Sequence, residues 1–465
     1  MRPKNPIVRR GIAGGVALLV ILAGFVSYRI YVDNGAGGRQ ATATSDQALR
    51  YAVDYPTIGY GTTPPSDPVA RLQAKIDRGA LTLRFTQPRG YLDSLLGALG
   101  IDTSSQMLVF SKTSLQTRNI SPKTPRALYF NDDTYVGWVP GGSVIEIAAM
   151  DPKLGFDFYT LENTVATAPG FDRQMRRCLR CHDTYELRGG GVPRLLAGSG
   201  YINEKGQLVS HEGWILVDDD TPIESRWGGW YVTGRHDDLR HLGNVIVKNL
   251  ADLQHLDKLR VGNLKSLDGQ FDTKPYLTDQ SDIVALMVFE HQLHVQNLIV
   301  RVNYDTRTAL HNEEQSKALL RTGSEHLSAD TMARVRTIAE PLVKAMLMVN
   351  QPKLNGPIVG LSGFAQKFEA QGPHDENGRT LRALDLKTRL FRYPLSYLVY
   401  SDAFDALPAV TKHYIYRRFA EVLEGKDQNA DFDNLSAAER SAILEILTAT
   451  KPDFAAVLAA WLQKH

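Results

Sequence analysis

The sequence predicts an α+β protein whose N-terminal half is rich in strands and whose C-terminal half is helical, preceded by one transmembrane helix. Three observations lead to this prediction. A long uncharged apolar run stands near the N-terminus, short apolar segments alternate with turn residues up to about residue 278, and segments with helical periodicity follow from residue 279. The composition, 43% hydrophobic and 22% charged over 465 residues, is that of a globular protein with a sizeable core.

The N-terminal run predicts a retained membrane anchor. Four basic residues among the first ten precede residues 11–28, which carry no charge, and the apolar stretch continues to residue 32. Such a run nearly crosses a bilayer, and the basic head favours the cytoplasmic side. A cleaved signal peptide, usually shorter and ending in small residues, is the alternative. We expect a cytoplasmic tail at 1–10, a signal anchor at 11–32, a flexible linker at 33–53 and a periplasmic domain at 54–465 of a bacterial inner-membrane protein.

The strand-rich part of this domain spans residues 54–278. After a group of prolines, a helical pattern is expected over residues 69–78. Gly141 and Gly142 indicate a hairpin-like turn. Short apolar runs bounded by turn residues predict strands at 107–111, 127–130, 135–139, 144–149, 208–217 and 227–233.

The helical part spans residues 279–465. Ser436 and Glu439 form a capping-box pattern ahead of an apolar periodic segment, which predicts the start of one helix. The full set of expected helices covers residues 279–304, 328–350, 379–389, 409–423 and 436–448.

Charge and cysteine content exclude two classes of protein. The 53 Lys and Arg residues nearly balance the 51 Asp and Glu residues, so nothing indicates the basic face that a nucleic-acid partner requires. Only two cysteines are present, and both lie within one five-residue stretch. An exported domain of this size is therefore not held together by a disulfide network.

The two cysteines belong to Cys178-Leu179-Arg180-Cys181-His182, which matches the C-x-x-C-H pattern of haem attachment. Two thiols at this spacing add across the two vinyl groups of a haem, and the adjacent histidine reaches the iron from the same turn. A surface disulfide is an alternative, whereas a zinc site would need a second ligand pair and a thioredoxin-like redox pair a βαβ context. We expect one covalent haem c, bound by Cys178 and Cys181, with His182 as proximal iron ligand.

The second iron ligand is not defined by the motif. No methionine stands between Met175 and Met287, so the downstream methionine of short soluble cytochromes c is missing. The iron either has no second protein ligand or takes one from Met287, a later methionine, His211, His236, His241, His255, His291 or His294.

The predicted helix at residues 279–304 is apolar on most of its surface but carries one polar stripe. Glu290, His294, Asn297 and Arg301 recur at helical spacing, and Met287, His291 and His294 also share a face. Burying these groups is costly unless they are hydrogen-bonded or coordinated. The stripe either forms an internal hydrogen-bond network or solvated edge, or faces the haem or a nearby metal. If it faces the haem, His294 or His291 is the expected distal ligand.

Three further groups have both a structural and a functional interpretation. The cluster Arg226-Trp227-Gly228-Gly229-Trp230, followed by His236 and His241, contains residue types that pack on haem edges and propionates. Residues 131–133 and 218–220 are acidic turns that could bind a cation. The alternative for the cluster is a strand with buried tryptophans. The alternative for the two acidic turns is that they simply face water.

Beyond these motifs, the sequence resembles a family of largely uncharacterised bacterial cytochrome c domain proteins with one haem each. The resemblance runs from about residue 55 to the C-terminus and implies that the strand-rich and helical parts form one unit around the haem. It carries over functional roles for Cys178, Cys181 and His182 alone. The matching stretches are residues 67–73, 104–116, 127–139, 178–182, 226–234 and 390–407.

These observations favour electron transfer, with redox proteins of the membrane or periplasm as partners and the bilayer contacted by the anchor. One haem needs far fewer residues than this domain has, so an enzyme is the alternative. In a peroxidase-type haem oxidoreductase, Glu290 or His294 would act as acid and base while Arg301 stabilises charge on peroxide oxygens. A haem-based sensor is a third hypothesis.

Overall fold

The computed structural model describes residues 57–463, apart from 186, 188, 211, 212, 261 and 322–325. The predicted tail, anchor and linker, and His211, lie outside the described residues. Within the described part, one helix is long and apolar enough to cross a membrane. This helix, α6 (Ile283–Leu320), lies mid-chain, and 83% of its most apolar stretch is buried inside the protein. Such burial is typical of a core helix.

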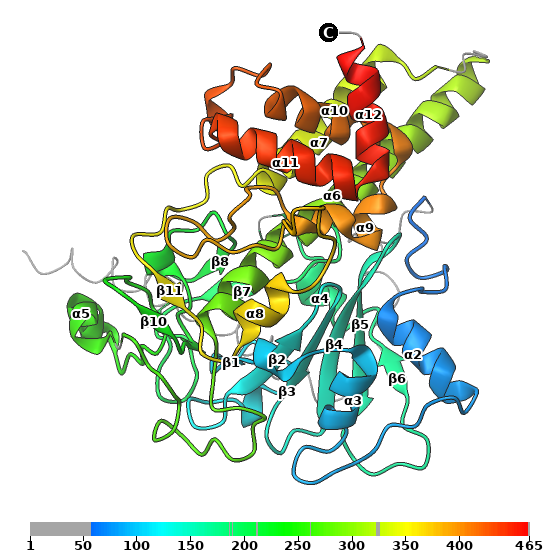
Figure 1. Ribbon diagram of the computed structural model, residues 1–465. Coiled ribbons are helices and arrows are strands. Elements are labelled where there is room, and N and C mark those ends of the chain that lie inside the picture. Colours follow the sequence, from blue (N-terminus) through cyan, green and yellow to red (C-terminus); the bar gives the residue numbers. More distant parts are fainter. Residues whose placement is uncertain are drawn as a thin grey trace, which may run out of the picture. The chain divides into compact units, whose positions relative to one another are not determined.

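A seven-stranded antiparallel sheet forms the strand-rich half, in the order β6-β5-β4-β3-β2-β1-β9 (Figure 1). Alternate side chains enter two different apolar cores. In β4, for example, Ile145 and Ile147 belong to one core and Ala148 and Met150 to the other. The strands are β1 (Met107–Val109), β2 (Arg126–Phe130), β3 (Thr134–Trp138), β4 (Val144–Asp151), β5 (Gly155–Glu162), β6 (Phe171–Arg173) and β9 (Trp230–Tyr231).

Helices contribute to the apolar cores on both sides of this sheet. On one side, α2 (Pro68–Asp77) and α3 (Leu92–Leu99) contribute buried residues to the smaller core. On the other side, α6 contributes to the larger core. Asp282 caps α6 by accepting hydrogen bonds from the amides of Val284 and Ala285. The cap fixes where α6 begins against the sheet.

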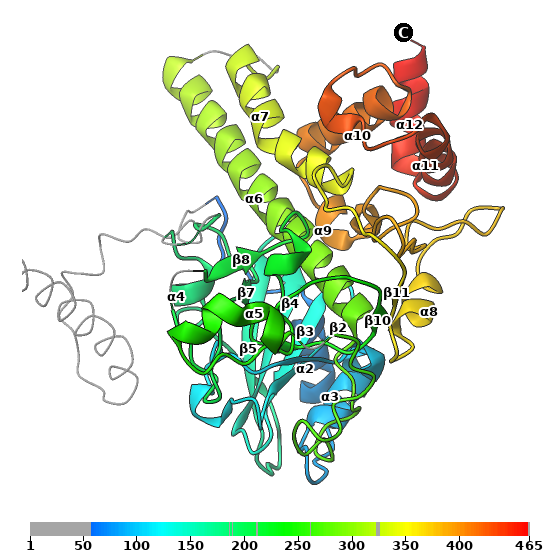
Figure 2. The ribbon, with the colours of Figure 1, turned by 90° about the vertical axis from the view of Figure 1, so that its left-hand side faces the viewer.

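The helical half packs around the far part of α6. Figure 2 shows α6 running past the sheet into this half, where α7 lies beside it. Helix α10 contacts α7, and α11 and α12 contact α10. The larger core therefore continues from the sheet through α6 into the last helices. These are α7 (Ala329–Met346), α8 (Phe364–Glu369), α9 (Asp402–Asp405), α10 (Ala409–Leu423), α11 (Ala437–Thr450) and α12 (Pro452–Leu462).

The segment between the sheet and α6 consists of short helices and strands. Helix α4 (Leu179–His182) contains most of the C-x-x-C-H motif, and α5 (Leu256–Leu259) follows a 3₁₀ segment at Leu250–His255. Two small antiparallel pairs complete the fold. They join β7 (Ala197–Ser199) with β8 (Ile215–Val217), and β10 (Arg235–His236) with β11 (Ile358–Val359).

The predicted α+β arrangement, strand-rich first and helical second, is confirmed. The hairpin at Gly141 joins β3 and β4, and the capping box of Ser436 and Glu439 begins α11. The helix predicted at 379–389 is wrong, because this segment is turn-rich and Leu386 has a left-handed φ of 55°. The strands predicted at 208–217 and 227–233 shorten to β8 and β9.

Candidate functional site

The C-x-x-C-H motif forms a single helical turn. The amide of His182 donates to the carbonyl of Cys178 at 3.0 Å, which places the histidine one turn beyond the first cysteine. No disulfide joins the two cysteines. Cys178 is half-buried and Cys181 is exposed. The turn thus presents two thiols and an imidazole within five residues.

Hydrogen bonds orient the imidazole of His182. Its Nδ1 lies 2.8 Å from the carbonyl oxygen of Arg194, and the Arg194 amide donates to the His182 carbonyl at 3.0 Å. Because a carbonyl only accepts, Nδ1 carries the hydrogen and the lone pair is on Nε2. Burial lowers the pKa of His182 to about 4, so the ring is neutral at pH 7. A neutral histidine whose other nitrogen donates to a carbonyl has the arrangement of a metal ligand.

Hydrogen bonds from Arg194 hold the segment that follows the motif, and the backbone of this segment passes so close to itself that it needs a glycine. The Arg194 guanidinium donates to the carbonyls of Thr184 and Leu187, at 3.3 and 3.0 Å. A side chain on Gly190 would meet the Thr184 carbonyl oxygen at 1.7 Å. The loop from the motif to Arg194 therefore folds back tightly on itself.

The polar stripe of α6 holds this loop. The side chain of Asn297 accepts from the amide of Leu195 at 3.0 Å and donates to the Leu195 carbonyl at 2.8 Å. One turn further, Arg301 donates to the carbonyls of Gly189, at 2.9 Å, and Gly190. Because Leu195 follows Arg194, the clamp at Asn297 fixes the backbone whose carbonyl orients His182.

Earlier in the stripe, Glu290 forms a buried ion pair with Arg226 at 2.8 Å, each side chain less than 5% exposed. Arg226 also donates to the backbone carbonyls of Thr221 and Asp219. Burial raises the pKa of Glu290 to about 7 although Arg226 opposes the shift. The pair ties α6 to the acidic segment at residues 218–220.

Asp219 joins two histidines of α6. One carboxylate oxygen lies 2.5 Å from Nδ1 of His291 and also accepts from Gln351, and the other accepts from Nδ1 of His294. Burial would raise the pKa of Asp219, but His294 and His291 hold it below its usual range. Burial lowers the pKa of His294, yet Asp219 outweighs it and raises the value to about 9.

The three candidate distal ligands on α6 differ in what they can still bind. His291 is fully buried, and its Nε2 lies 2.9 Å from the Ser396 hydroxyl, so both ring nitrogens are engaged. Met287 is 3% exposed in the apolar core. The side chain of His294 is 17% exposed, and no described residue hydrogen-bonds to its Nε2.

The remaining histidine candidates separate into two places. His236 and His241 approach each other with Nε2 atoms 3.3 Å apart, and His241 Nδ1 accepts from the Gly243 amide. Trp227 contacts His241 edge-on at 5.1 Å between ring centroids. This predicted cluster is thus a pair of neutral imidazoles beside a buried tryptophan. His255 is exposed at the end of its 3₁₀ segment.

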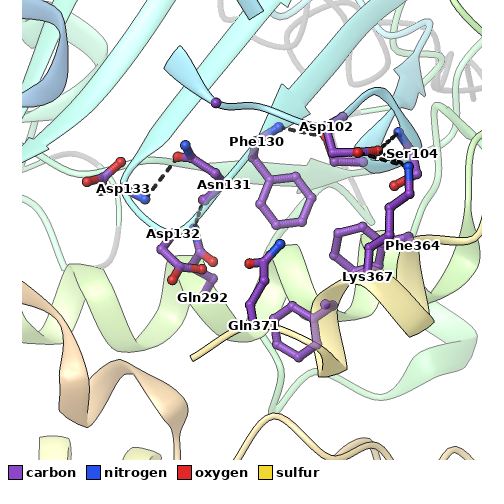
Figure 3. A pocket seen from close by; sticks show the side chains of 13 residues that line it. Asp102, Ser104, Phe130, Asn131, Asp132, Asp133, Gln292, Phe364, Lys367 and Gln371 are labelled. Carbon is purple, nitrogen blue, oxygen red and sulfur yellow. Dashed lines mark hydrogen bonds and ion pairs between the residues drawn. The ribbon is translucent and has the colours of Figure 1, made fainter. Parts of the chain in front are cut away.

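The acidic turn at residues 131–133 lines a cavity of about 280 Å³ next to α8 (Figure 3). Asp132 forms an ion pair with Arg382, and Asp133 accepts from the Thr134 hydroxyl. Gln292 lines the cavity from α6 on the side opposite to His294. Both acidic side chains therefore have structural partners.

Carboxylates gather in two places where a metal ion could be held. Asp219, Asp220 and His294 form one group, although the first and last already bond to each other. The other consists of the buried Asp67, Asp151 and Asp157, which the sequence did not single out. Asp67 caps α2, and Asp151 accepts four hydrogen bonds from neighbouring residues, so these two act structurally.

In comparisons with protein-family models, curated proteins and solved structures, nothing matches this chain. The resemblance to single-haem cytochrome c domain proteins therefore stays a prediction. A proposal for the function therefore depends on the contacts that the chain's own residues make.

Proposed function

We propose that this chain is a membrane-anchored periplasmic c-type cytochrome that transfers electrons through one covalently bound haem. The observation that supports this proposal most is the geometry of His182. Its Nδ1 donates to the Arg194 carbonyl, which leaves the Nε2 lone pair for iron beside two thiols on the same turn. A zinc site is less well supported, because neither group of possible metal ligands among the described residues includes Cys178, Cys181 or His182.

The residues present fit a haem c. Cys178 and Cys181 would form the thioether bonds, and His182 would be the proximal ligand. The haem supplies a one-electron iron couple. Two contacts of this chain tune the His182 ligand. The hydrogen bond to the Arg194 carbonyl increases the basicity of Nε2. The ring of Phe158, whose centroid lies 4.5 Å from that of His182, excludes water beside the imidazole.

On the distal side, we favour His294 over His291. A ligand needs a free nitrogen, and both nitrogens of His291 are engaged by Asp219 and Ser396. His294 has Nδ1 on Asp219 and is partly exposed, and because Asp219 raises its pKa to about 9, its Nε2 would bind iron by giving up a proton. A carboxylate on Nδ1 is the arrangement that makes Nε2 a stronger ligand or a better base.

The same Asp219–His294 pair is the observation that keeps a peroxidase-type haem oxidoreductase as the second candidate. The other residues of that hypothesis are engaged elsewhere. Glu290 is paired with Arg226, and Arg301 is bound to two backbone carbonyls. An acid–base role would therefore fall to His294. This distribution of contacts supports electron transfer as the first candidate.

Spectroscopy and mass measurement test the proposal. The full-length chain is produced in a bacterial strain with cytochrome-maturation machinery, and its mass and its ultraviolet–visible spectra are recorded in both oxidation states. We expect one added haem and a low-spin spectrum that carbon monoxide does not change. The Cys178→Ser/Cys181→Ser variant should be colourless.

Each other outcome has a definite meaning. A high-spin ferric spectrum with rapid reaction toward peroxide would favour the enzyme. Colourless wild-type protein without added mass would contradict the haem altogether.

A further inference from the structure

We propose that Asp67, Asp151 and Asp157 form a structural calcium site that joins the start of α2 to the β4–β5 hairpin. Asp67 precedes α2, Asp151 ends β4, and Asp157 lies in β5. The site goes beyond the proposed function, because no step of electron transfer depends on it.

The three carboxylates are close enough to bind one ion. One oxygen of each lies within 4.8 Å of the chosen oxygens of the other two. Calcium binds oxygen ligands at about 2.3–2.6 Å, so two oxygens on opposite sides of one ion are about 5 Å apart at most. Asp67, Asp151 and Asp157 are 0–2% exposed. The group is therefore compact and shielded from water.

This group carries more negative charge than its surroundings neutralise. Arg173 pairs with Asp157 at 2.7 Å, whereas none of the described ion pairs includes Asp67 or Asp151. Two of the three negative charges thus remain without a cationic partner. Buried charges without a partner are strongly destabilising. A divalent cation would neutralise both.

Asp157 also has an oxygen that the protein does not satisfy. Arg173 binds Oδ1 through both Nε and Nη2. No hydrogen bond from the described residues reaches the buried Oδ2. The Tyr60 hydroxyl lies beside Asp157, but it donates its one hydrogen to the Phe156 carbonyl at 2.9 Å. A buried carboxylate oxygen without a donor indicates a further partner, and a cation is the suitable kind.

Hydrogen bonds hold the other two carboxylates in fixed orientations. Asp67 accepts from two amides at the start of α2 and from the Tyr159 hydroxyl at 2.6 Å. Asp151 accepts from two amides of the β4–β5 turn and from the amide and hydroxyl of Ser66. Carboxylates that bind metals are commonly hydrogen-bonded in this way. Because Ser66 is exposed, the site lies just beneath the surface.

Calcium suits this group better than other common metal ions. All three side chains offer oxygen, which hard cations such as Ca²⁺ and Mg²⁺ prefer. Magnesium requires a nearly ideal octahedron and usually keeps several waters, whereas calcium accepts irregular sites built from protein oxygens. A buried group of carboxylates leaves little room for bound water. We therefore expect selectivity for calcium.

Thermal unfolding of the full-length protein in detergent tests the site. Bound metal is first removed with a chelator, and the midpoint temperature of unfolding (Tm) is then measured with excess calcium chloride, excess magnesium chloride or neither. Calcium should raise the Tm by about 3–5 °C, because an ion that binds only the folded state stabilises it. Magnesium should raise it less. Calorimetric titration with calcium should give one ion per chain.

Matched variants locate the ion. Asp157→Asn keeps an acceptor for Arg173, so the variant should fold, but its Tm should not respond to calcium. Its calcium affinity should fall by about tenfold or more. Asp282→Asn changes a buried carboxylate outside the group, at the cap of α6. That variant should keep the whole calcium-induced rise in Tm, whatever its Tm without calcium.

Two results would overturn the site. If calcium leaves the Tm of the wild-type chain unchanged, the excess charge of the group is not neutralised by this ion. If calcium raises the Tm of Asp157→Asn as much as that of the wild type, the ion binds elsewhere. Both measurements can be made on coloured or colourless protein, so a failure of the calcium site is distinguishable from a failure of the proposed haem.

Discussion

At the scale of single residues, hydrogen bonds give two histidines of one helix different roles. His291 and His294 both bind Asp219 through Nδ1, so the sequence spacing alone cannot separate them. The difference comes from Ser396, more than a hundred residues away, which engages the second nitrogen of His291. His291 therefore belongs to a buried network, whereas Nε2 of His294 has no hydrogen-bond partner among the described residues.

Substituting these histidines separately tests that distinction. We expect His294→Ala to convert a low-spin ferric spectrum to high spin, because the distal ligand is lost. His291→Ala should keep the spin state but lower the free energy of unfolding by about 3 kcal/mol, because buried hydrogen-bonding groups lose their partner. Absorption spectra and denaturant unfolding measure the two effects, with the exposed His255→Ala as control. A spin change in His291→Ala would reverse the assignment.

The raised pKa of His294 makes a pH dependence testable in the haem-free Cys178→Ser/Cys181→Ser variant. The folded value of about 9 exceeds the reference value of 6.5, so the stabilisation is complete below pH 6.5 and is lost as the pH rises through 9. We expect the free energy of unfolding to fall by about 3 kcal/mol between pH 6.5 and 10. Adding His294→Gln should remove this part of the pH dependence. An identical pH profile in both proteins would show that the Asp219 pair is not charged.

At the scale of elements, α6 connects the C-x-x-C-H motif to the fold. Its polar stripe binds three parts of the preceding segment, through Arg226, Asp219 and Leu195. Of the two interpretations of the stripe, the described contacts form an internal hydrogen-bond network. This network ends at the carbonyl that orients His182, so in the proposed cytochrome a structural stripe would still act on the iron ligand.

We therefore expect Asn297 to act as a positioning residue. Asn297→Ala frees the backbone at Leu195 and weakens the hydrogen bond between Arg194 and His182, which makes Nε2 less basic. The midpoint potential of the haem should rise by tens of millivolts, because a weaker ligand stabilises ferric iron less. Potentiometric titration measures this change.

A matched control exists on the same helix. Asn303 is 3% exposed and bonds only weakly to Arg307 at 3.4 Å. Asn303→Ala should lower the free energy of unfolding without changing the potential. Equal shifts of potential in both variants would mean that general loosening of α6, and not the clamp at Leu195, is responsible.

Local patterns in the sequence predicted many of the helices and strands, but few of the long-range side-chain contacts. The hairpin at Gly141 and the capping box at Ser436 depend on neighbouring residues, so they were predictable. Strand β5 was missed because it is buried on both faces and lacks a clear alternation. The helix predicted at 379–389 failed because backbone turns, including the left-handed Leu386, override a weak helical pattern. The roles of Asp219 and Ser396 depend on long-range contacts that no local pattern contains.

At the scale of the whole molecule, the strand-rich and helical halves share one apolar core. Phe156 of β5 and Phe419 of α10 belong to the same cluster, with α6 packed against both halves. A core without a boundary between the halves predicts cooperative unfolding, because neither half can bury its apolar surface alone.

Phe419→Ala tests this cooperativity. The side chain is fully buried, so its truncation should lower the free energy of unfolding by about 3–5 kcal/mol. If the halves unfold together, hydrogen exchange should accelerate in β4 and β5 by the same free energy as in α10. Leu319→Ala, at a side chain that is 84% exposed, should leave exchange unchanged. Faster exchange confined to the helices would contradict a shared core, and the C-x-x-C-H motif would then depend on the strand-rich half and α6 alone.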